Sequence, residues 1–137
     1  MKTVVTIVED NERLLADLQT IVESAPKCRC AGAFRTGEEA IREIPMIRPD
    51  VVLMDINLPG ISGIEVTRQL KQQIPALLVI IITVYRDLDK IFEALKAGAS
   101  GYLLKRSSPD EVRRAIIDVC AGGAPMSAEI ARRVVEM

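Results

Sequence analysis

Short apolar runs alternate with amphipathic segments along almost the whole chain. The runs are rich in Val and Ile and nearly continuous, which is typical of strands that are buried on both faces. On this pattern, strands are predicted at residues 4–8, 28–34, 51–54, 77–82 and 101–104.

Between these runs, apolar residues recur at spacings of three and four, which predicts helices with one buried face. Helices are expected at residues 11–25, 36–46, 62–73, 87–98 and 108–122, with a short further helix after Ser127. A Ser or Thr followed three residues later by Glu predicts capping boxes that begin at Thr36, Ser62 and Ser108.

This alternation of strands and helices predicts an α/β fold with a parallel, doubly wound sheet. Right-handed crossovers leave few topologies, and five strands favour the flavodoxin-like (βα)5 arrangement with strand order 2-1-3-4-5. A length of 137 residues suits one domain. We therefore expect a domain at residues 1–124, followed at residues 125–137 by a tail with a short extra helix.

The composition excludes several kinds of chemistry. The chain has no histidine, which rules out Ser-His and Cys-His dyads and imidazole metal ligands. Three cysteines do not complete a disulfide framework, and a net charge of -1 gives no basis for a strongly basic nucleic-acid surface or for membrane attraction. The first apolar run is too short to span a bilayer, which favours a cytoplasmic protein. Acid–base or phosphate chemistry must rest on carboxylates, hydroxyls and lysines.

Polar side chains follow four of the predicted strands. They are Glu9 and Asp10 after the first strand, Asp55 after the third, Thr83 after the fourth and Lys105 after the fifth. In an open parallel sheet, ligands bind beyond the carboxyl ends of the strands. The predicted strand order makes these four strands neighbours, so carboxylates, a hydroxyl and an ammonium are expected to meet at one edge.

Such a cluster of carboxylates needs a cation. Two carboxylates about 4 Å apart repel each other by roughly 4 kcal/mol at an effective dielectric constant of 20. Mg²⁺, which binds oxygen ligands and uses few carboxylates, would relieve this repulsion. Lys105 adds a positive charge and Thr83 a neutral donor, so a phosphoryl group on Asp55 would find suitable partners there.

Each of these residues, taken singly, also fits an ordinary role. Glu9 and Asp10 suit the cap of the following helix, Asp55 suits a turn, Thr83 suits a solvated strand end and Lys105 suits a surface charge. Their occurrence at four strand ends of one sheet edge is what favours a functional site.

Four motifs resemble the receiver domain of two-component response regulators, over almost the whole chain. They are VEDN at residues 8–11, LMDINLPG at 53–60, IT at 82–83 and GASGYLLK at 98–105. The resemblance implies that Asp55 accepts a phosphoryl group from a sensor histidine kinase or a small acyl phosphate. It also implies that the domain catalyses only its own phosphorylation and dephosphorylation, and is otherwise not an enzyme.

The same resemblance implies a role for each site residue. The implied ligands of Mg²⁺, for which Mn²⁺ can substitute, are Glu9, Asp10, Asp55 and the backbone carbonyl of Asn57. Thr83 would bind a phosphoryl oxygen and Lys105 would pair with the phosphate. Tyr102 resembles the aromatic switch residue that turns inward when Thr83 moves toward the phosphate.

The motifs GYLLK at residues 101–105 and AGGAPMS at 121–127 resemble the NarL/FixJ class. Members of that class usually continue through a linker into a LuxR-type helix-turn-helix domain that binds DNA. The resemblance implies that residues 125–137 begin this linker, that DNA is bound only by an output domain outside this chain, and that phosphorylation favours a homodimer. The face of residues 87–98, 101–104 and 108–122 is the expected dimer or effector surface. A natural single-domain receiver remains an alternative.

Two positions bear on details of this resemblance. Arg106 stands where many receivers have a proline with a cis bond, which leaves the geometry of the Lys105–Arg106 bond open. Tyr85, two residues beyond Thr83, occupies a position that flanks the phosphoryl group. Because Tyr85 is bulky, our hypothesis is that it shields the acyl phosphate from water.

Other classes of protein share parts of the pattern. A flavin-binding module would want a Ser/Thr/Gly-rich phosphate loop after the first strand, where Glu9 and Asp10 stand. A phosphatase with an Asp nucleophile, of the haloacid-dehalogenase-like kind, would carry its D-x-D motif after the first strand, whereas Asp55 and Asn57 follow the third. A receiver-fold interaction module that works without phosphorylation is a further alternative.

Overall fold

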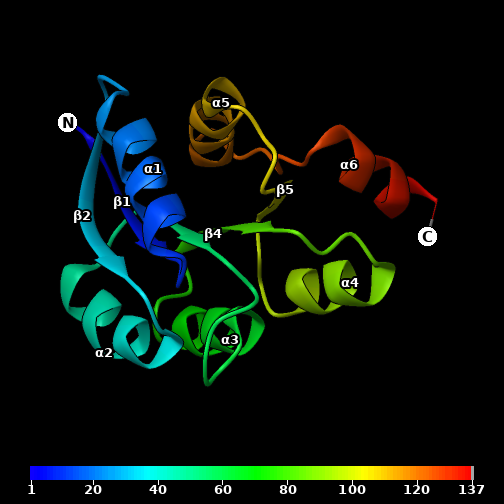
Figure 1. Ribbon diagram of the computed structural model, residues 1–137, viewed down its shortest axis with the longest axis horizontal. Coiled ribbons are helices and arrows are strands. Elements are labelled where there is room, and N and C mark those ends of the chain that lie inside the picture. Colours follow the sequence, from blue (N-terminus) through cyan, green and yellow to red (C-terminus); the bar gives the residue numbers. More distant parts are fainter. Residues whose placement is uncertain (137) are drawn as a thin grey trace.

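The computed structural model describes residues 1–136 and confirms the predicted α/β architecture (Figure 1). Its strands are β1 (Thr3–Val8), β2 (Cys28–Phe34), β3 (Val51–Met54), β4 (Leu78–Thr83) and β5 (Gly101–Leu104). Its helices are α1 (Glu12–Glu23), α2 (Gly37–Ile47), α3 (Gly63–Gln73), α4 (Leu88–Lys96), α5 (Pro109–Cys120) and α6 (Ala128–Val135). One strand boundary differs from the prediction at a candidate site residue, because Thr83 is the last residue of β4 and not the first residue after it.

All strand pairings are parallel, and the order β2-β1-β3-β4-β5 is the predicted one. Val8, at the end of β1, pairs with Phe34 on one side and Met54 on the other. Met54 in turn pairs with Ile81, and Thr83 pairs with Leu104. The carboxyl ends of the strands are therefore nearly level, so the residues that follow them share one edge.

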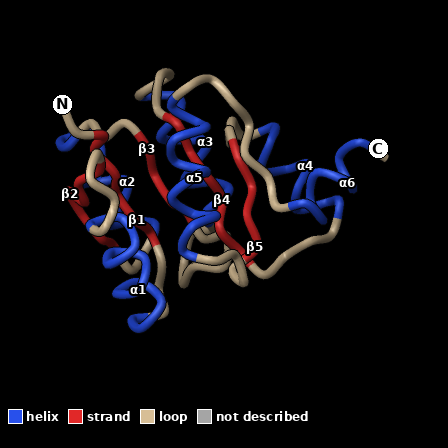
Figure 2. The backbone as a smooth tube through the Cα atoms, turned by 90° about the horizontal axis from the view of Figure 1, so that it is seen from above, coloured by secondary structure: helices blue, strands red, loops and turns tan. Residues whose placement is uncertain are grey.

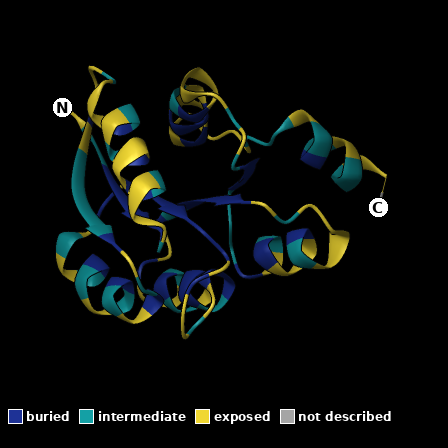
Figure 3. Ribbon diagram, in the orientation of Figure 1, coloured by how far each residue is buried: buried dark blue, intermediate teal, exposed yellow. Residues whose placement is uncertain are grey.

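Side chains of the sheet alternate between two aliphatic cores. Val51 and Leu53 point to the face that α1 and α5 cover, whereas Val52 and Met54 point to the face that α2, α3 and α4 cover. In Figure 1 the sheet lies between α1 and α5 on one side and α2, α3 and α4 on the other, and Figure 2 shows the strands side by side in the order given above. Figure 3 shows that β1, β3, β4 and β5 are largely buried, whereas the edge strand β2 is mostly only partly buried. This burial explains why the strand segments are apolar on both faces.

Only one of the predicted capping boxes is complete. Ser108 and Glu111 bond reciprocally at the start of α5. The hydroxyls of Thr36 and Ser62 also cap their helices, but the carboxylate three residues later is engaged elsewhere. After Thr36 it accepts from the backbone N–H of Arg35, and after Ser62 it pairs with an arginine further along α3. The prediction of three boxes was wrong at these two helices.

The tail packs on the domain along the edge of β5. Met126 forms a parallel bridge with Tyr102, and the Ser127 hydroxyl accepts a hydrogen bond of 2.9 Å from the N–H of Leu104. Ile130, on α6, is fully buried in the core that includes α4. The short helix predicted after Ser127 thus exists, and α6 lies beside α4 (Figure 1).

Glu129 of α6 is an ion-pair centre between two loops. Its carboxylate lies 3.2 Å from Nη1 of Arg86, in the loop after β4, and 2.6 Å from Nη2 of Arg106, in the loop after β5. The peptide bond between Lys105 and Arg106, whose geometry the sequence left open, is trans. Within residues 1–136, no helix combines the length and the apolar character needed to cross a membrane.

Candidate functional site

The backbone around Asp55 is fixed from two sides. Its N–H donates to the carbonyl of Val8 at 3.0 Å, which continues the pairing of β1 and β3 by one residue. On the other side, α3 begins in direct contact with it, because a Cβ atom at Gly63 would lie 1.8 Å from the Asp55 carbonyl oxygen. Asp55 therefore sits, 3 % exposed, between the end of β3 and the start of α3.

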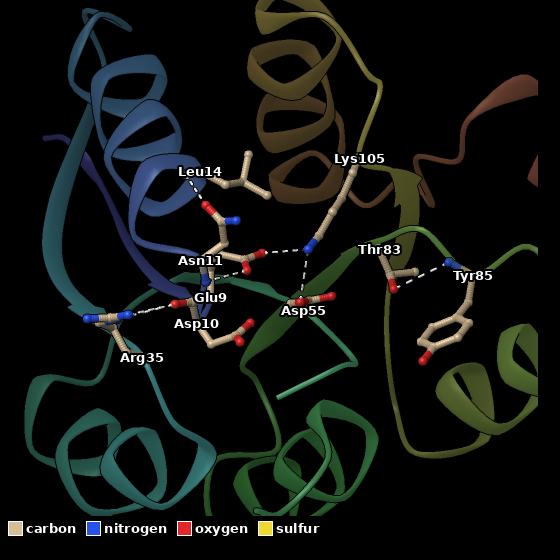
Figure 4. A network of polar contacts seen from close by, with 9 residues as sticks. All are labelled: Glu9, Asp10, Asn11, Leu14, Arg35, Asp55, Thr83, Tyr85 and Lys105. Atoms are coloured by element: carbon tan, nitrogen blue, oxygen red, sulfur yellow. Dashed lines mark hydrogen bonds and ion pairs between the residues drawn. The ribbon is translucent and has the colours of Figure 1, made fainter. Parts of the chain in front are cut away.

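Glu9, Asp10 and Asp55 form the expected acidic cluster. One carboxylate oxygen from each lies within 4.8 Å of the others. Glu9 is 1 % exposed, and Asp10 is partly exposed at the rim. Figure 4 shows the three carboxylates converging from the loops after β1 and β3.

Lys105 completes the cluster from the end of β5. Its ammonium nitrogen lies 3.1 Å from Oε1 of Glu9 and 3.1 Å from Oδ2 of Asp55. Its backbone N–H donates to the carbonyl of Thr83 at 2.9 Å, so the start of the loop after β5 is tied to the end of β4. Four of the five residues that the strand-end pattern pointed to therefore form one cluster, and the fifth, Thr83, is joined to Lys105 through its backbone carbonyl.

Burial dominates the electrostatics of the site. It raises the pKa of the Asp55 carboxyl even though Lys105 acts to lower it, and it raises the pKa of the Glu9 carboxyl, to which the charge of Asp55 adds. Burial alone would lower the pKa of Lys105, but Asp55 and Glu9 together raise it. Three carboxylates against one ammonium leave a formal surplus of two negative charges.

The residues present fit a hard divalent cation. Oδ1 of Asp55 is buried and has no hydrogen-bond partner among the residues described, so it offers a free acceptor inside the acidic cluster. Asn57 lies two residues further on in the exposed part of the loop after β3, and its carbonyl accepts no backbone hydrogen bond from the described part of the chain. Carboxylate and carbonyl oxygens with room for water are what Mg²⁺ prefers.

Thr83 and Tyr102 are both buried near this edge of the sheet. The Thr83 hydroxyl accepts a hydrogen bond of 3.5 Å from the N–H of Tyr85. The Tyr102 hydroxyl donates to the carbonyl of Tyr85 at 2.8 Å, so the aromatic ring already points inward in this structure. Figure 4 shows the ring of Tyr85 on the α4 side of Thr83, apart from Asp55.

Arg35 is a residue of the site that the sequence pattern missed. Its Nε and Nη2 atoms donate to the carbonyl oxygen of Asp10 at 3.3 Å and 3.1 Å (Figure 4). Arg35 directly follows β2, so the strand-end rule places it at the same edge of the sheet, but the rule does not give the direction of its side chain.

The fold and the site define a class: a flavodoxin-like domain with an acidic cluster and a lysine at the carboxyl edge of its sheet. Residues 5–117 match the family model of the response regulator receiver domain. The chain therefore belongs to the receiver-domain family of two-component response regulators.

Several known proteins are similar to this chain. The transcriptional regulatory protein DegU of Brevibacillus brevis is 31% identical over 98% of this chain and 57% of its own length. The response regulator UvrY of Escherichia coli K12 is 33% identical over 95% of this chain and 60% of its own length. A LuxR-family response regulator from Aurantimonas sp. SI85-9A1 has a TM-score of 0.94 and 32% identity, over 99% of this chain and 97% of that one. The chain thus spans less than two thirds of the length of DegU and of UvrY.

Proposed function

We propose that this chain is a phosphoacceptor switch in which Asp55 takes up a phosphoryl group. The observation that carries the proposal is the environment of the Asp55 carboxylate. One of its oxygens is held by Lys105, and the other is buried without a hydrogen-bond partner in the described residues. A carboxylate in this setting is positioned by one cation and still free to form a new bond.

The reaction is an in-line displacement at phosphorus. An oxygen of Asp55 forms the new P–O bond while the P–N bond of a kinase phosphohistidine, or the P–O bond of a small acyl phosphate, breaks. The electron pair of the broken bond leaves with the imidazole, which then takes a proton from water, or with the carboxylate of the acyl phosphate. Lys105 neutralises charge on the transferred group, and the hydroxyl of Thr83 binds one of its oxygens.

Glu9, Asp10, Asp55 and the carbonyl of Asn57 would hold Mg²⁺, for which Mn²⁺ can substitute. When bound, this ion supplies positive charge that reduces the repulsion between the carboxylates and the incoming phosphoryl group. The acidic cluster and its surplus of negative charge support this assignment.

The switch follows from the same contacts. Because the Lys105 N–H is bonded to the Thr83 carbonyl, movement of either side chain toward the phosphate would change the geometry between β4 and β5. Tyr102 and Tyr85 lie next to this connection, so we assign them as the first residues to respond. The face built by α4, β5 and α5, on whose β5 edge the tail and α6 lie, would then change its contacts and favour a homodimer.

The partners of the switch follow from its family. A sensor histidine kinase would supply the phosphoryl group to the domain at residues 1–124. Residues 125–137 would form the start of the connection to a DNA-binding domain in a longer protein of the DegU and UvrY kind, so that transcription is the regulated output.

Intact-mass measurement after incubation with acetyl phosphate tests this function. We expect a gain of one phosphoryl group with Mg²⁺, no gain with EDTA, and no gain in the Asp55→Asn variant under either condition. The matched control is Asp50→Asn, a carboxylate at the opposite edge of the sheet whose Oδ2 accepts from the N–H of Val4. It should be phosphorylated like the wild type.

A failure to gain mass calls for beryllium fluoride, because a kinase-specific receiver does not react with acetyl phosphate. If wild-type protein binds neither acyl phosphate nor beryllium fluoride, the phosphoacceptor function is wrong and the chain is a receiver-fold interaction module. Sedimentation of the phosphorylated form tests the dimer separately, since a monomer at all concentrations would contradict only that part.

A further inference from the structure

The peptide unit between Asp10 and Asn11 is held at both of its polar ends. Its N–H, on Asn11, donates to Oε2 of Glu9 at 2.9 Å. Its carbonyl oxygen, on Asp10, accepts from Nε and Nη2 of Arg35 at 3.3 Å and 3.1 Å. A single amide plane therefore connects Arg35 to two carboxylates of the acidic cluster.

Neighbouring elements place Arg35 where it can make this contact. The backbone N–H of Glu9 donates to the carbonyl of Phe34 at 2.9 Å, so the loops after β1 and β2 leave the sheet side by side. The N–H of Arg35 itself donates to Glu39 at 3.3 Å at the start of α2. Its side chain is then directed across the loop after β1, as Figure 4 shows.

We propose that Arg35 is a positioning residue for the metal-binding carboxylates Glu9 and Asp10. Its role is indirect, because it acts on these carboxylates through the peptide unit between Asp10 and Asn11. Its planar guanidinium donates two hydrogen bonds to one oxygen, which fixes the plane of that peptide. The fixed plane aims its N–H at Glu9, and a hydrogen-bonded carbonyl makes the N–H of the same amide a stronger donor. This inference rests on the proposed function, because it assumes that the cluster binds a divalent cation.

A role for the charge of Arg35 and a role for its hydrogen bonds predict opposite effects on cation binding, so an experiment can separate the two roles. If its positive charge were what mattered, removal of the charge would strengthen cation binding at the acidic cluster, because a repulsive charge is lost. If its hydrogen bonds matter, removal of them weakens cation binding although the charge is also lost. Arg35→Lys keeps the charge and loses the rigid two-bond fork, so it isolates the effect of geometry.

The test is titration of metal-free protein with Mn²⁺ alone, followed by the electron paramagnetic resonance signal of the free ion, with Mg²⁺ as a competitor. We expect Arg35→Lys and Arg35→Ala to weaken binding of both ions roughly three- to tenfold. This lies at or below the lower end of the range for residues that orient metal ligands, because the Arg35 side chain is 57% exposed.

Glu12→Gln is the matched control. Glu12 forms an ion pair with Arg35, at 3.9 Å from its Nη1 atom, whereas the hydrogen bonds to the Asp10 carbonyl come from Nε and Nη2. Its variant removes the ion pair and keeps both hydrogen bonds, so the affinity for Mn²⁺ should stay within about twofold of the wild-type value at physiological salt. Urea unfolding in EDTA, run on every variant, shows whether the metal-free fold is intact.

The possible results of the Mn²⁺ titration test the positioning role of Arg35, its structural role and the existence of the metal site separately. Equal affinity in the wild type and both Arg35 variants, or tighter binding in Arg35→Ala, would overturn the positioning role and leave the phosphoacceptor function standing. Weaker binding that merely follows a loss of stability in EDTA would reduce Arg35 to a structural residue. If the wild-type protein binds neither Mn²⁺ nor Mg²⁺, the cluster is not a metal site, and the proposed function fails together with this inference.

Discussion

The ammonium nitrogen of Lys105 lies 3.1 Å from Oδ2 of Asp55, although the two residues are 50 positions apart in the sequence. The same nitrogen lies 3.1 Å from Glu9. Both carboxylates are almost fully buried, so Lys105 is the cation that makes their ionised forms tolerable in the metal-free protein. A bound Mg²⁺ would take over part of this task, which couples stability, metal binding and phosphoryl transfer.

Replacement of Lys105 by Met should therefore destabilise the metal-free protein. Two buried carboxylates would lose their ion pair, and we expect the free energy of unfolding at neutral pH to fall by about 1–3 kcal/mol. Excess Mg²⁺ should restore a larger part of the stability in this variant than it adds to the wild type. Urea unfolding with EDTA and with Mg²⁺ measures both effects.

Lys27→Met provides the control for this variant, because Lys27 is an exposed lysine at the opposite edge of the sheet. It should unfold like the wild type under both conditions. Equal stability of Lys105→Met and wild-type protein in EDTA would show that Lys105 does not neutralise the cluster.

The raised pKa of Asp55 gives the metal-free protein an unusual pH dependence. A carboxyl whose pKa is higher in the folded than in the unfolded state contributes stability below its unfolded pKa, near 3.8, and this contribution is lost as the pH rises through the folded pKa. In EDTA, the stability of the wild type relative to Asp55→Asn should therefore decrease from acidic to neutral pH. Urea midpoints of the two proteins across this range measure the difference.

Mg²⁺ should reverse that trend, because it binds ionised carboxylates and not protonated ones. The stabilisation that it gives to the wild type should increase as the pH rises, while Asp55→Asn should gain less at every pH. Parallel pH profiles for the two proteins in EDTA would contradict the raised pKa of Asp55.

Gly63→Ala should be strongly destabilising because of a steric clash alone. The added Cβ would lie 1.8 Å from the carbonyl oxygen of Asp55, a backbone atom that cannot move away without shifting Asp55 itself. We expect a loss of about 2–4 kcal/mol in the free energy of unfolding, together with a loss of phosphorylation by acetyl phosphate. Thermal and urea unfolding measure the first and intact mass the second.

Gly122→Ala is the control that separates the steric clash of an added Cβ from the strain of a left-handed backbone conformation. Gly122 has a φ of +95° and nothing within 4 Å of an added Cβ, so its variant suffers only the strain of a left-handed residue, about 1 kcal/mol. It should keep normal phosphorylation. If both glycine variants lose the same stability and both are still phosphorylated, the contact between α3 and Asp55 is not what fixes the position of Asp55.

The parts of the fold that depend on local pattern were predictable from the sequence. The strand order followed from the alternation of strands and helices, and the meeting of Glu9, Asp10, Asp55 and Lys105 followed from the rule that strand ends share one edge. Both predictions use only the position of a residue relative to its strand, which the apolar runs indicate clearly.

The parts that depend on side-chain direction were not predictable. An exposed arginine such as Arg35 can turn to many acceptors, and its choice of the Asp10 carbonyl depends on how the loops after β1 and β2 leave the sheet. The same holds for Glu39, which bonds to Arg35 where a capping box was predicted, and for Glu129, whose arginine partners lie in two other loops. A sequence shows the presence of such groups but not their rotamers.

Glu129→Gln should loosen α6 without unfolding the domain. The variant removes the charge that pairs with Arg86 and Arg106, while the buried Ile130 still holds the helix on the core. We expect faster amide hydrogen exchange confined to residues 128–135 and to the two loops that carry these arginines. Glu136→Gln, in an exposed residue at the end of the same helix, should exchange like the wild type.

The pH dependence gives a second check on the role of Glu129. Hydrogen bonds from Arg106 and Arg86 lower the pKa of its carboxyl, so its contribution to the docking of α6 is present above the unfolded pKa, near 4.5, and is lost as the pH falls through the folded value. Wild-type exchange in α6, corrected for the intrinsic effect of pH, should approach that of Glu129→Gln in acid. Exchange that is the same in both proteins at neutral pH would show that the ion pairs do not hold the helix.

Tyr85→Ala tests whether an aromatic side chain beside Thr83 protects the phosphoryl group. Its backbone N–H bonds to the Thr83 hydroxyl and its carbonyl accepts from Tyr102, so the substitution keeps both backbone contacts and removes only the ring. If the ring moves over the acyl phosphate and excludes water, its loss should speed hydrolysis several-fold, whereas Tyr85→Phe should behave like the wild type. The rate is measured by intact mass after removal of the phosphodonor.

Phe92→Ala, in a half-exposed aromatic of α4, controls for a general loosening of that helix. An unchanged rate in Tyr85→Ala would mean that the ring stays on the α4 side of Thr83 after phosphorylation, and the lifetime of the phosphoryl group would then depend on the loop after β3, where Asn57 stands.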